Sequence, residues 1–190
     1  MKTIRKLLLL CLFGMISMGA WATVYEGKMS GSYISWSLDS YTGLLTINGT
    51  GYMPEDWYDA DDYYDNSFER YSTSIRSVKI EDGIKSITQE CFFGCSNLQY
   101  ITIPSSIEKI GNGAFCGCAK LSSVVLPEGI NNIEYNTFYG CSGLTSISLP
   151  NSLKEIGGMA FYGCTNLSSI VFPESVEIIG GMILFIYLDQ

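Results

Sequence analysis

The feature that most constrains the fold of this chain is a repeat of 23 residues in its second half. The clearest marker of the repeat is a cysteine in fixed phase, found at Cys95, Cys118, Cys141 and Cys164. Four consecutive units align around this cysteine, and a half-unit at 75–80 precedes them. One such unit cannot bury its apolar side alone, so a period of this length indicates a solenoid in which neighbouring units share a core.

The columns of the aligned units predict one short strand and one packed turn per coil. Leu98, Ile101 and Ile103 alternate in the way that suits a strand with one buried face. Prolines, which have no N–H to donate, end these segments at Pro104, Pro127, Pro150 and Pro173. We expect a phenylalanine column to fill the wide side of each coil, and the glycine before each repeating cysteine to allow a tight turn.

The first 22 residues predict an export signal. Three basic residues precede an apolar stretch from Leu7 to Met18, and Ala20-Trp21-Ala22 has the small-x-small form of a cleavage site. The apolar stretch is short for a bilayer and contains Gly14, which argues against a transmembrane anchor. We therefore expect an exported protein, extracellular or at the cell surface.

The composition argues against most enzyme classes. The chain has no histidine, which removes the commonest general base, the usual zinc ligand and every Ser-His or Cys-His pair. It has 11 basic and 19 acidic side chains, a balance that repels phosphate and argues against nucleic-acid binding. The sequence predicts a protein without enzymatic activity, cofactor or metal.

The repeat units resemble the BspA-like bacterial leucine-rich repeats, whose consensus reads I-x-x-I-G-x-x-A-F-x-G-C-x-x-L-x-x-I-x-L-P. The resemblance runs from Ile75 to about Gly181, and residues 31–52 are similar to the β-hairpin cap that opens such arrays. It implies a β-rich solenoid, a right-handed leucine-rich repeat array with an N-terminal hairpin cap. It also implies an exported or surface-exposed protein without enzymatic activity, and some members of the family bind host extracellular-matrix or plasma proteins.

We divide the chain accordingly into a signal peptide at 1–22, a cap with an acidic aromatic loop at 23–73, and a solenoid at 74–190. Four full units occupy 84–175, and a broken fifth occupies 176–190. The apolar end of that fifth unit either covers the last coil or marks a shortened copy of a longer array. In the second case we expect end-to-end self-association through 182–188.

The segment 52–71 is the least repetitive part and is rich in acidic and aromatic side chains. Clustered carboxylates suit calcium, but the spacing lacks the glycine and the distal glutamate of a known calcium loop. Exposed aromatic rings would suit a sugar or peptide platform. We favour a solvated loop that packs its aromatics onto the cap. The residues of interest are Trp57, Tyr58, Asp59, Asp61, Asp62 and Tyr63.

The repeating cysteines allow three interpretations. A metal site is weak, because ladder positions line a rod and do not converge on a tetrahedron. Disulfides are conceivable, since the step between coils is about 4.8 Å and export favours oxidation. We favour buried free thiols that act as small apolar side chains, because the position follows a repeating glycine in a packed turn.

The outward positions of the expected strands form the most informative surface, which is flat, uncharged and rich in hydroxyl groups. We predict ligand binding at Tyr100, Thr102, Ser123, Val125, Ser146, Ser148, Ser169 and Val171. The simplest alternative for this face is a plain solvated sheet. We expect a binding module for a protein or a glycan at the cell surface; the alternative is a structural or truncated repeat fragment with no ligand of its own.

Overall fold

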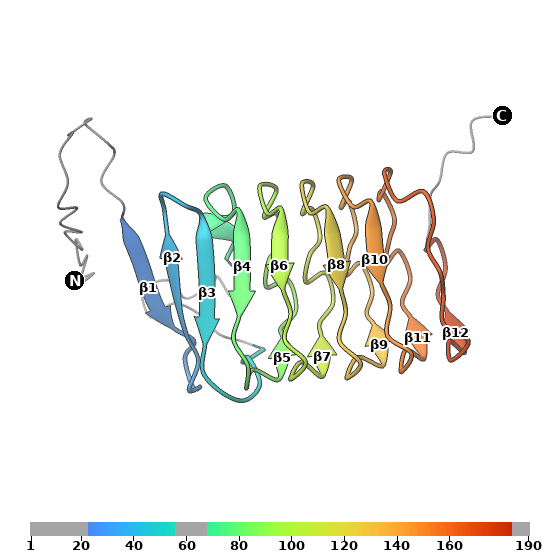
Figure 1. Cartoon of the computed structure of the whole chain (residues 1–190), viewed down its shortest axis with the longest axis horizontal. Helices are drawn as coiled ribbons and strands as arrows, with labels where there is room; N and C mark the ends of the chain where they lie inside the picture. Colours follow the sequence, from blue (N-terminus) through green and yellow to red (C-terminus); the bar gives the residue numbers. More distant parts are fainter. Residues whose placement is uncertain (1–22, 56–67, 184–190) are drawn as a thin grey trace, which may run out of the picture.

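The structure is a computed structural model that describes residues 23–55 and 68–183. Stacked coils follow one another in a single direction from a β-hairpin cap (Figure 1). The described ranges contain short strands and one 3-10 turn, η1 (Glu69–Tyr71), and no α-helix. The predicted β-rich solenoid with a hairpin cap is confirmed.

The cap is an antiparallel meander of three strands. They are β1 (Val24–Lys28), β2 (Ser35–Asp39) and β3 (Leu44–Asn48). The turn between β2 and β3 forms because the Asp39 carboxylate accepts the backbone N–H groups of Tyr41 and Thr42, and because Gly43 takes a φ of 74°. The strand β3 then pairs in parallel with the first strand of the repeats, which joins the cap to the array.

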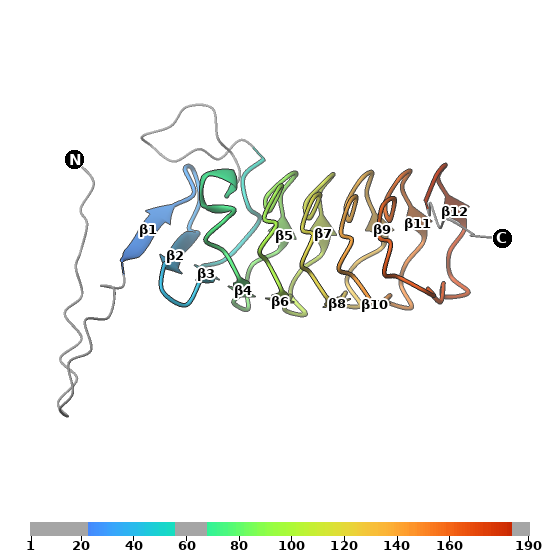
Figure 2. The same cartoon turned by 90° about the horizontal axis from the view of Figure 1, so that it is seen from above.

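Each coil of the array contributes to two lines of parallel strands, visible along the array in Figure 2. The front strands are β4 (Ser77–Ile80), β6 (Tyr100–Thr102), β8 (Ser123–Val125) and β10 (Ser146–Ser148). The rear strands are β5 (Ser86–Ile87), β7 (Lys109–Ile110), β9 (Asn132–Ile133), β11 (Glu155–Ile156) and β12 (Ile178–Ile179). Paired residues lie one repeat apart, as Ser123 and Ser146 do, so the period of the sequence is the register of the sheets.

The core is organised around the predicted phenylalanine column. The rings stack nearly parallel, with centroids 5.3 to 5.8 Å apart, and belong to Phe68, Phe92, Phe115, Phe138 and Phe161. The first of these lies outside the recognisable repeats, and its ring edge also meets Trp36 of the cap at 5.5 Å. Phe68 therefore connects the core of the cap to the core of the coils.

The last coils differ from the sequence prediction at two places. The segment around Ser169 and Val171 is not a strand, because it lies at the end of the front sheet with a neighbouring strand on one side only. The fifth unit keeps its coil further than its sequence indicates, since β12 pairs with β11 and the N–H of Phe161 donates to the carbonyl of Ile183. Residues 184–190 lie outside the described part.

Candidate functional site

The open strand face, formed by the outward side chains of the front strands, carries all eight predicted binding residues. Each of the eight is exposed. The register places Ser77 beside Tyr100 and Lys79 beside Thr102, and likewise Ser123 beside Ser146 and Val125 beside Ser148. The predicted side chains thus stand in two rows, side by side along the array.

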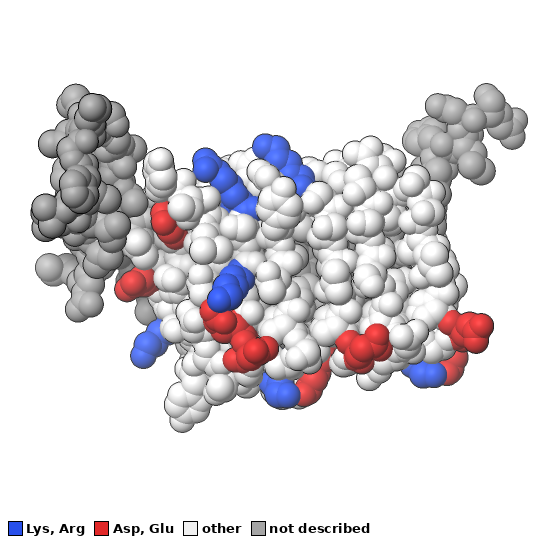
Figure 3. Space-filling view, in the orientation of Figure 1, with Lys and Arg blue, Asp and Glu red and all other residues white. Residues whose placement is uncertain are grey.

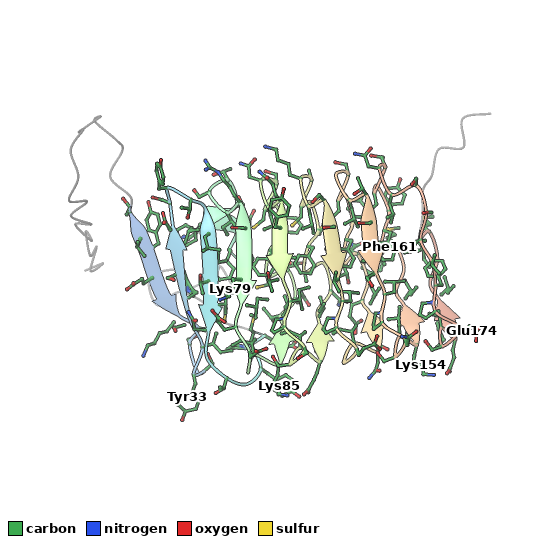
Figure 4. The ribbon with its side chains drawn as sticks, in the orientation of Figure 1. Tyr33, Lys79, Lys85, Lys154, Phe161 and Glu174 are labelled. Atoms are coloured by element: carbon green, nitrogen blue, oxygen red, sulfur yellow. The ribbon has the colours of Figure 1, made fainter. Side chains whose placement is uncertain are left out.

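The face extends beyond the repeats onto the cap, which the sequence interpretation did not include. One line of register crosses five strands at Glu26, Ser37, Thr46, Lys79 and Thr102. The alignment of 75–80 with the later strands was the signal that could have identified Lys79. Figure 4 shows this lysine on the strand face, and its Nζ lies 2.8 Å from Glu81.

Charge is distributed unevenly over this surface. In Figure 3 the charged side chains gather over the cap half and along the edges, whereas the surface over β6, β8 and β10 is uncharged. The expectation of an uncharged face therefore fits the repeats and does not fit the cap. At the cap end, a shallow hollow of about 460 Å³ lies over β1 and β2 and is lined by Glu26, Lys28 and Ser37, among others.

The lower edge of the array carries ion pairs between successive coils, at Lys85 and Lys154 in Figure 4. The Nζ of Lys85 lies 2.6 Å from Glu108, whose other oxygen accepts the Tyr52 hydroxyl at 2.6 Å. The hydrogen bond from Lys85 lowers the pKa of Glu108, and the bond to Glu108 raises the pKa of Tyr52. These groups are solvent-exposed, so the pairs align coils and add little stability.

The six residues of interest in the acidic aromatic loop, Trp57 to Tyr63, lie outside the described residues. The described ends of that loop contact the rear of the array: Glu55 pairs with Lys109 of β7 at 2.8 Å, and the N–H of Phe68 donates to the carbonyl of Cys91. These ends therefore do not flank the open strand face.

The structure favours the buried-thiol interpretation of the cysteines over a disulfide ladder. The six described cysteines are free thiols, and all are buried except the half-buried Cys116. Burial raises the pKa of the Cys95 and Cys164 thiols to about 12, so they stay protonated and unreactive. Within the described ranges no three His, Cys, Asp or Glu side chains gather as metal ligands would.

None of the described segments forms a helix with the length and apolar character that a membrane crossing requires. The predicted signal peptide at 1–22 falls outside the described residues.

Comparison with known proteins identifies the repeats. The profile of the family described as BspA type Leucine rich repeat region matches residues 62–186 in six copies. A search of curated proteins returns no significant match.

Solved structures share the architecture. A leucine-rich repeat protein from Bacteroides ovatus is 29% identical over 57% of this chain and 30% of its own, with a TM-score of 0.50. One from Eubacterium ventriosum is 24% identical over 83% of this chain and 45% of its own, with a TM-score of 0.58. The leucine-rich repeat protein of T. pallidum is 23% identical over 82% of each chain, with a TM-score of 0.54. The chain thus spans less than half the length of the first two, and the last two likenesses show the fold alone.

Proposed function

Because the chain belongs to the BspA-type leucine-rich repeat family, we propose that it is an exported, non-enzymatic binding module. Its partner, a protein or a glycan at the cell surface, lies across the open strand face. The observation that carries the proposal is the register of the outward rows, which holds hydroxyl groups and short apolar side chains at the same height on successive coils.

Three properties of the face support this function. It presents hydrogen-bonding groups at intervals of about 4.8 Å, the spacing of neighbouring strands. It places the exposed ring of Tyr100 among hydroxyl groups, and tyrosine is enriched where proteins meet. The charged cap half, with Glu26 and Lys79, adds groups that orient a partner along the array. A typical specific interface takes about 800 Å² per partner, so a protein would use most of the face.

The competing function is a structural role without a ligand of its own. The small number of coils favours this alternative, and a plain solvated strand face would serve it equally well. The two functions differ in one measurable way, because a structural module tolerates any substitution on the face that leaves its fold intact.

Export is tested by the N-terminus of the secreted chain. Cleavage after Ala22 predicts that the secreted protein begins at Thr23, which N-terminal sequencing reads directly. A chain retained inside the cell with residues 1–22 intact would contradict this part of the proposal.

Binding is tested with matched substitutions on and off the face. The secreted chain is screened against purified extracellular-matrix and plasma proteins and against a glycan array. We expect Tyr100→Ala and Ser146→Arg to reduce binding of any partner found at least tenfold. The controls are Tyr33→Ala and Thr165→Arg, which make the same changes at exposed positions elsewhere; Tyr33 points away from the face in Figure 4. Equal binding by all four variants would exclude the face as the site.

A further inference from the structure

Two hollows adjoin one another at the rear of the array, beside β5 and β7 and the turns that follow them. Their volumes are about 160 Å³ and 240 Å³, and both are lined by Gln89 and Asn112. We name them together the rear groove, whose principal residues are Thr88, Gln89, Phe93, Asn112, Tyr135 and Asn136. The groove follows the rear strands, so it is separate from the open strand face.

The rear groove contains buried polar atoms that the protein itself leaves without a partner. Thr88 is 4% exposed, and its Oγ1 has no hydrogen-bond partner. The Oδ1 of Asn136 is likewise buried and unpaired. Among the described residues these are the two side-chain atoms in that condition, and one lines each hollow. Buried polar atoms are normally satisfied, so two orphans in adjoining hollows indicate a ligand that supplies hydrogen bonds.

The remaining groups of the groove indicate the chemistry of that ligand. The backbone around it is already engaged between coils: the N–H of Glu90 donates to Asn112, and the N–H of Gly113 donates to Tyr135. An extended peptide would therefore find side chains there and few free backbone groups, which disfavours pairing by strand addition. The free groups are hydroxyl, amide and carboxylate side chains.

Apolar ring faces accompany these polar groups. Phe93 and Tyr135 line the second hollow and are both exposed. An exposed aromatic ring beside amides and hydroxyls suits a ligand that has both apolar faces and many hydroxyl groups. We propose that the rear groove binds an oligosaccharide. Its sugar hydroxyls donate to Thr88 Oγ1 and Asn136 Oδ1, and a ring face packs on Tyr135.

The size and charge of the groove define the class of sugar. Pockets for drug-sized molecules enclose about 300–1,000 Å³, so each hollow takes one sugar unit and the pair takes two consecutive units. The carboxylates of Glu90 and Glu134 line the two hollows, and Lys109 is paired with Glu55. The groove therefore selects neutral sugars over uronic or sialic acids.

The test uses the full secreted chain and calorimetric titration with chitotriose, mannotriose, xylotriose and a galacturonic acid trimer. We expect at least one neutral trisaccharide to bind and the acidic trimer not to bind. Thr88→Val keeps the side-chain shape and Asn136→Gly suits the φ of 58° at that position, so both variants should fold. Each is expected to weaken binding at least about fivefold, because one hydrogen bond is lost. Thr102→Val, the same change on the open strand face, should leave the affinity within twofold.

Several outcomes would overturn the proposal. These are an absence of binding by every neutral trisaccharide, binding that Thr88→Val does not weaken, and stronger binding of the acidic trimer. A peptide from a random library that bound the wild-type chain, lost affinity in Thr88→Val and was not displaced by sugars would assign the groove to peptides instead. The variants used to test the open strand face should not change sugar binding, so failure at one site is distinguishable from failure at the other.

Discussion

The thiol of Cys141 donates a hydrogen bond to the backbone carbonyl of Phe115, one coil earlier, with an Sγ–O distance of 3.1 Å. The same contact joins Cys118 to Phe92 and Cys164 to Phe138. The repeating cysteine is therefore a small buried side chain that also satisfies a carbonyl of the preceding coil. Since the donor is an S–H group, each of these contacts requires a free thiol.

We predict that alkylation of the native chain by iodoacetamide modifies Cys116 first. Cys116 is half-buried, whereas Cys91, Cys95 and Cys141 are buried. Mass spectrometry of the peptides should show the remaining described cysteines labelled only after unfolding, without any reductant. Cysteines that need a reductant before they label in the unfolded chain would show that disulfides have formed.

We predict that the protein loses stability above about pH 9. The pKa of Cys164 is raised from near 9 to about 12 by burial, so below pH 9 folded and unfolded chains both hold the proton. Between these values only the folded chain holds it, and the free energy of unfolding falls by up to about 1.4 kcal/mol per pH unit for each such thiol. Urea unfolding at pH 7.5, 9 and 10 measures this slope. In Cys164→Ala the slope should be shallower, and an unchanged slope would assign the effect to other groups.

We predict that Phe115→Ala lowers the free energy of unfolding by about 3–5 kcal/mol. The ring is fully buried between Phe92 and Phe138, with centroids 5.5 and 5.3 Å away, so its loss leaves a cavity in the middle of the column. The control is Tyr33→Ala, which removes an exposed ring and should change stability by less than about 0.5 kcal/mol. Comparable losses in the two variants would contradict a continuous core.

We predict opposite effects of two substitutions at one position of successive coils. Glu90 and Gly113 lie one repeat apart with φ values of 54° and 59°, in the left-handed region. Glu90→Gly should stabilise by about 1 kcal/mol and Gly113→Ala should destabilise by a similar amount, because a Cβ is strained there. A Cβ on Gly113 would have no atom nearer than 3.4 Å, so thermal unfolding of this pair measures backbone conformation alone. Changes of the same sign in both variants would contradict this account.

We predict concentration-dependent self-association through the end of the array. Ile178 and Ile179 of β12 are 56% and 54% exposed, although the equivalent Ile156 in the previous coil is fully buried. Exposed apolar side chains on an unpaired edge strand favour pairing with another copy. Sedimentation velocity should show larger species at high concentration for the parent chain and for the control Thr165→Lys, and monomers for Ile179→Lys. A parent chain that stays monomeric would refute the prediction.

Much of the fold was predictable because burial makes the sequence periodic. A side chain that must face the core in every coil returns after 23 residues, as Phe92 and Phe115 do, and its column can be read without coordinates. Phe68 was not assigned to that column because it follows a segment without the repeat. The charged cap half was also missed, since the antiparallel register that aligns Glu26 with Ser37 is set by the hairpin and not by the period.

The sequence by itself determined the coil, its core columns, the hairpin cap and the exposed rows of the open strand face. These features follow from the placement of each side chain in or out of a shared core, which a period records. Only the tertiary structure decided which polar atoms are left unpaired. Thr88 and Asn136 occupy different positions in coils two repeats apart, and they line adjoining hollows because the stacking of the coils brings their turns together.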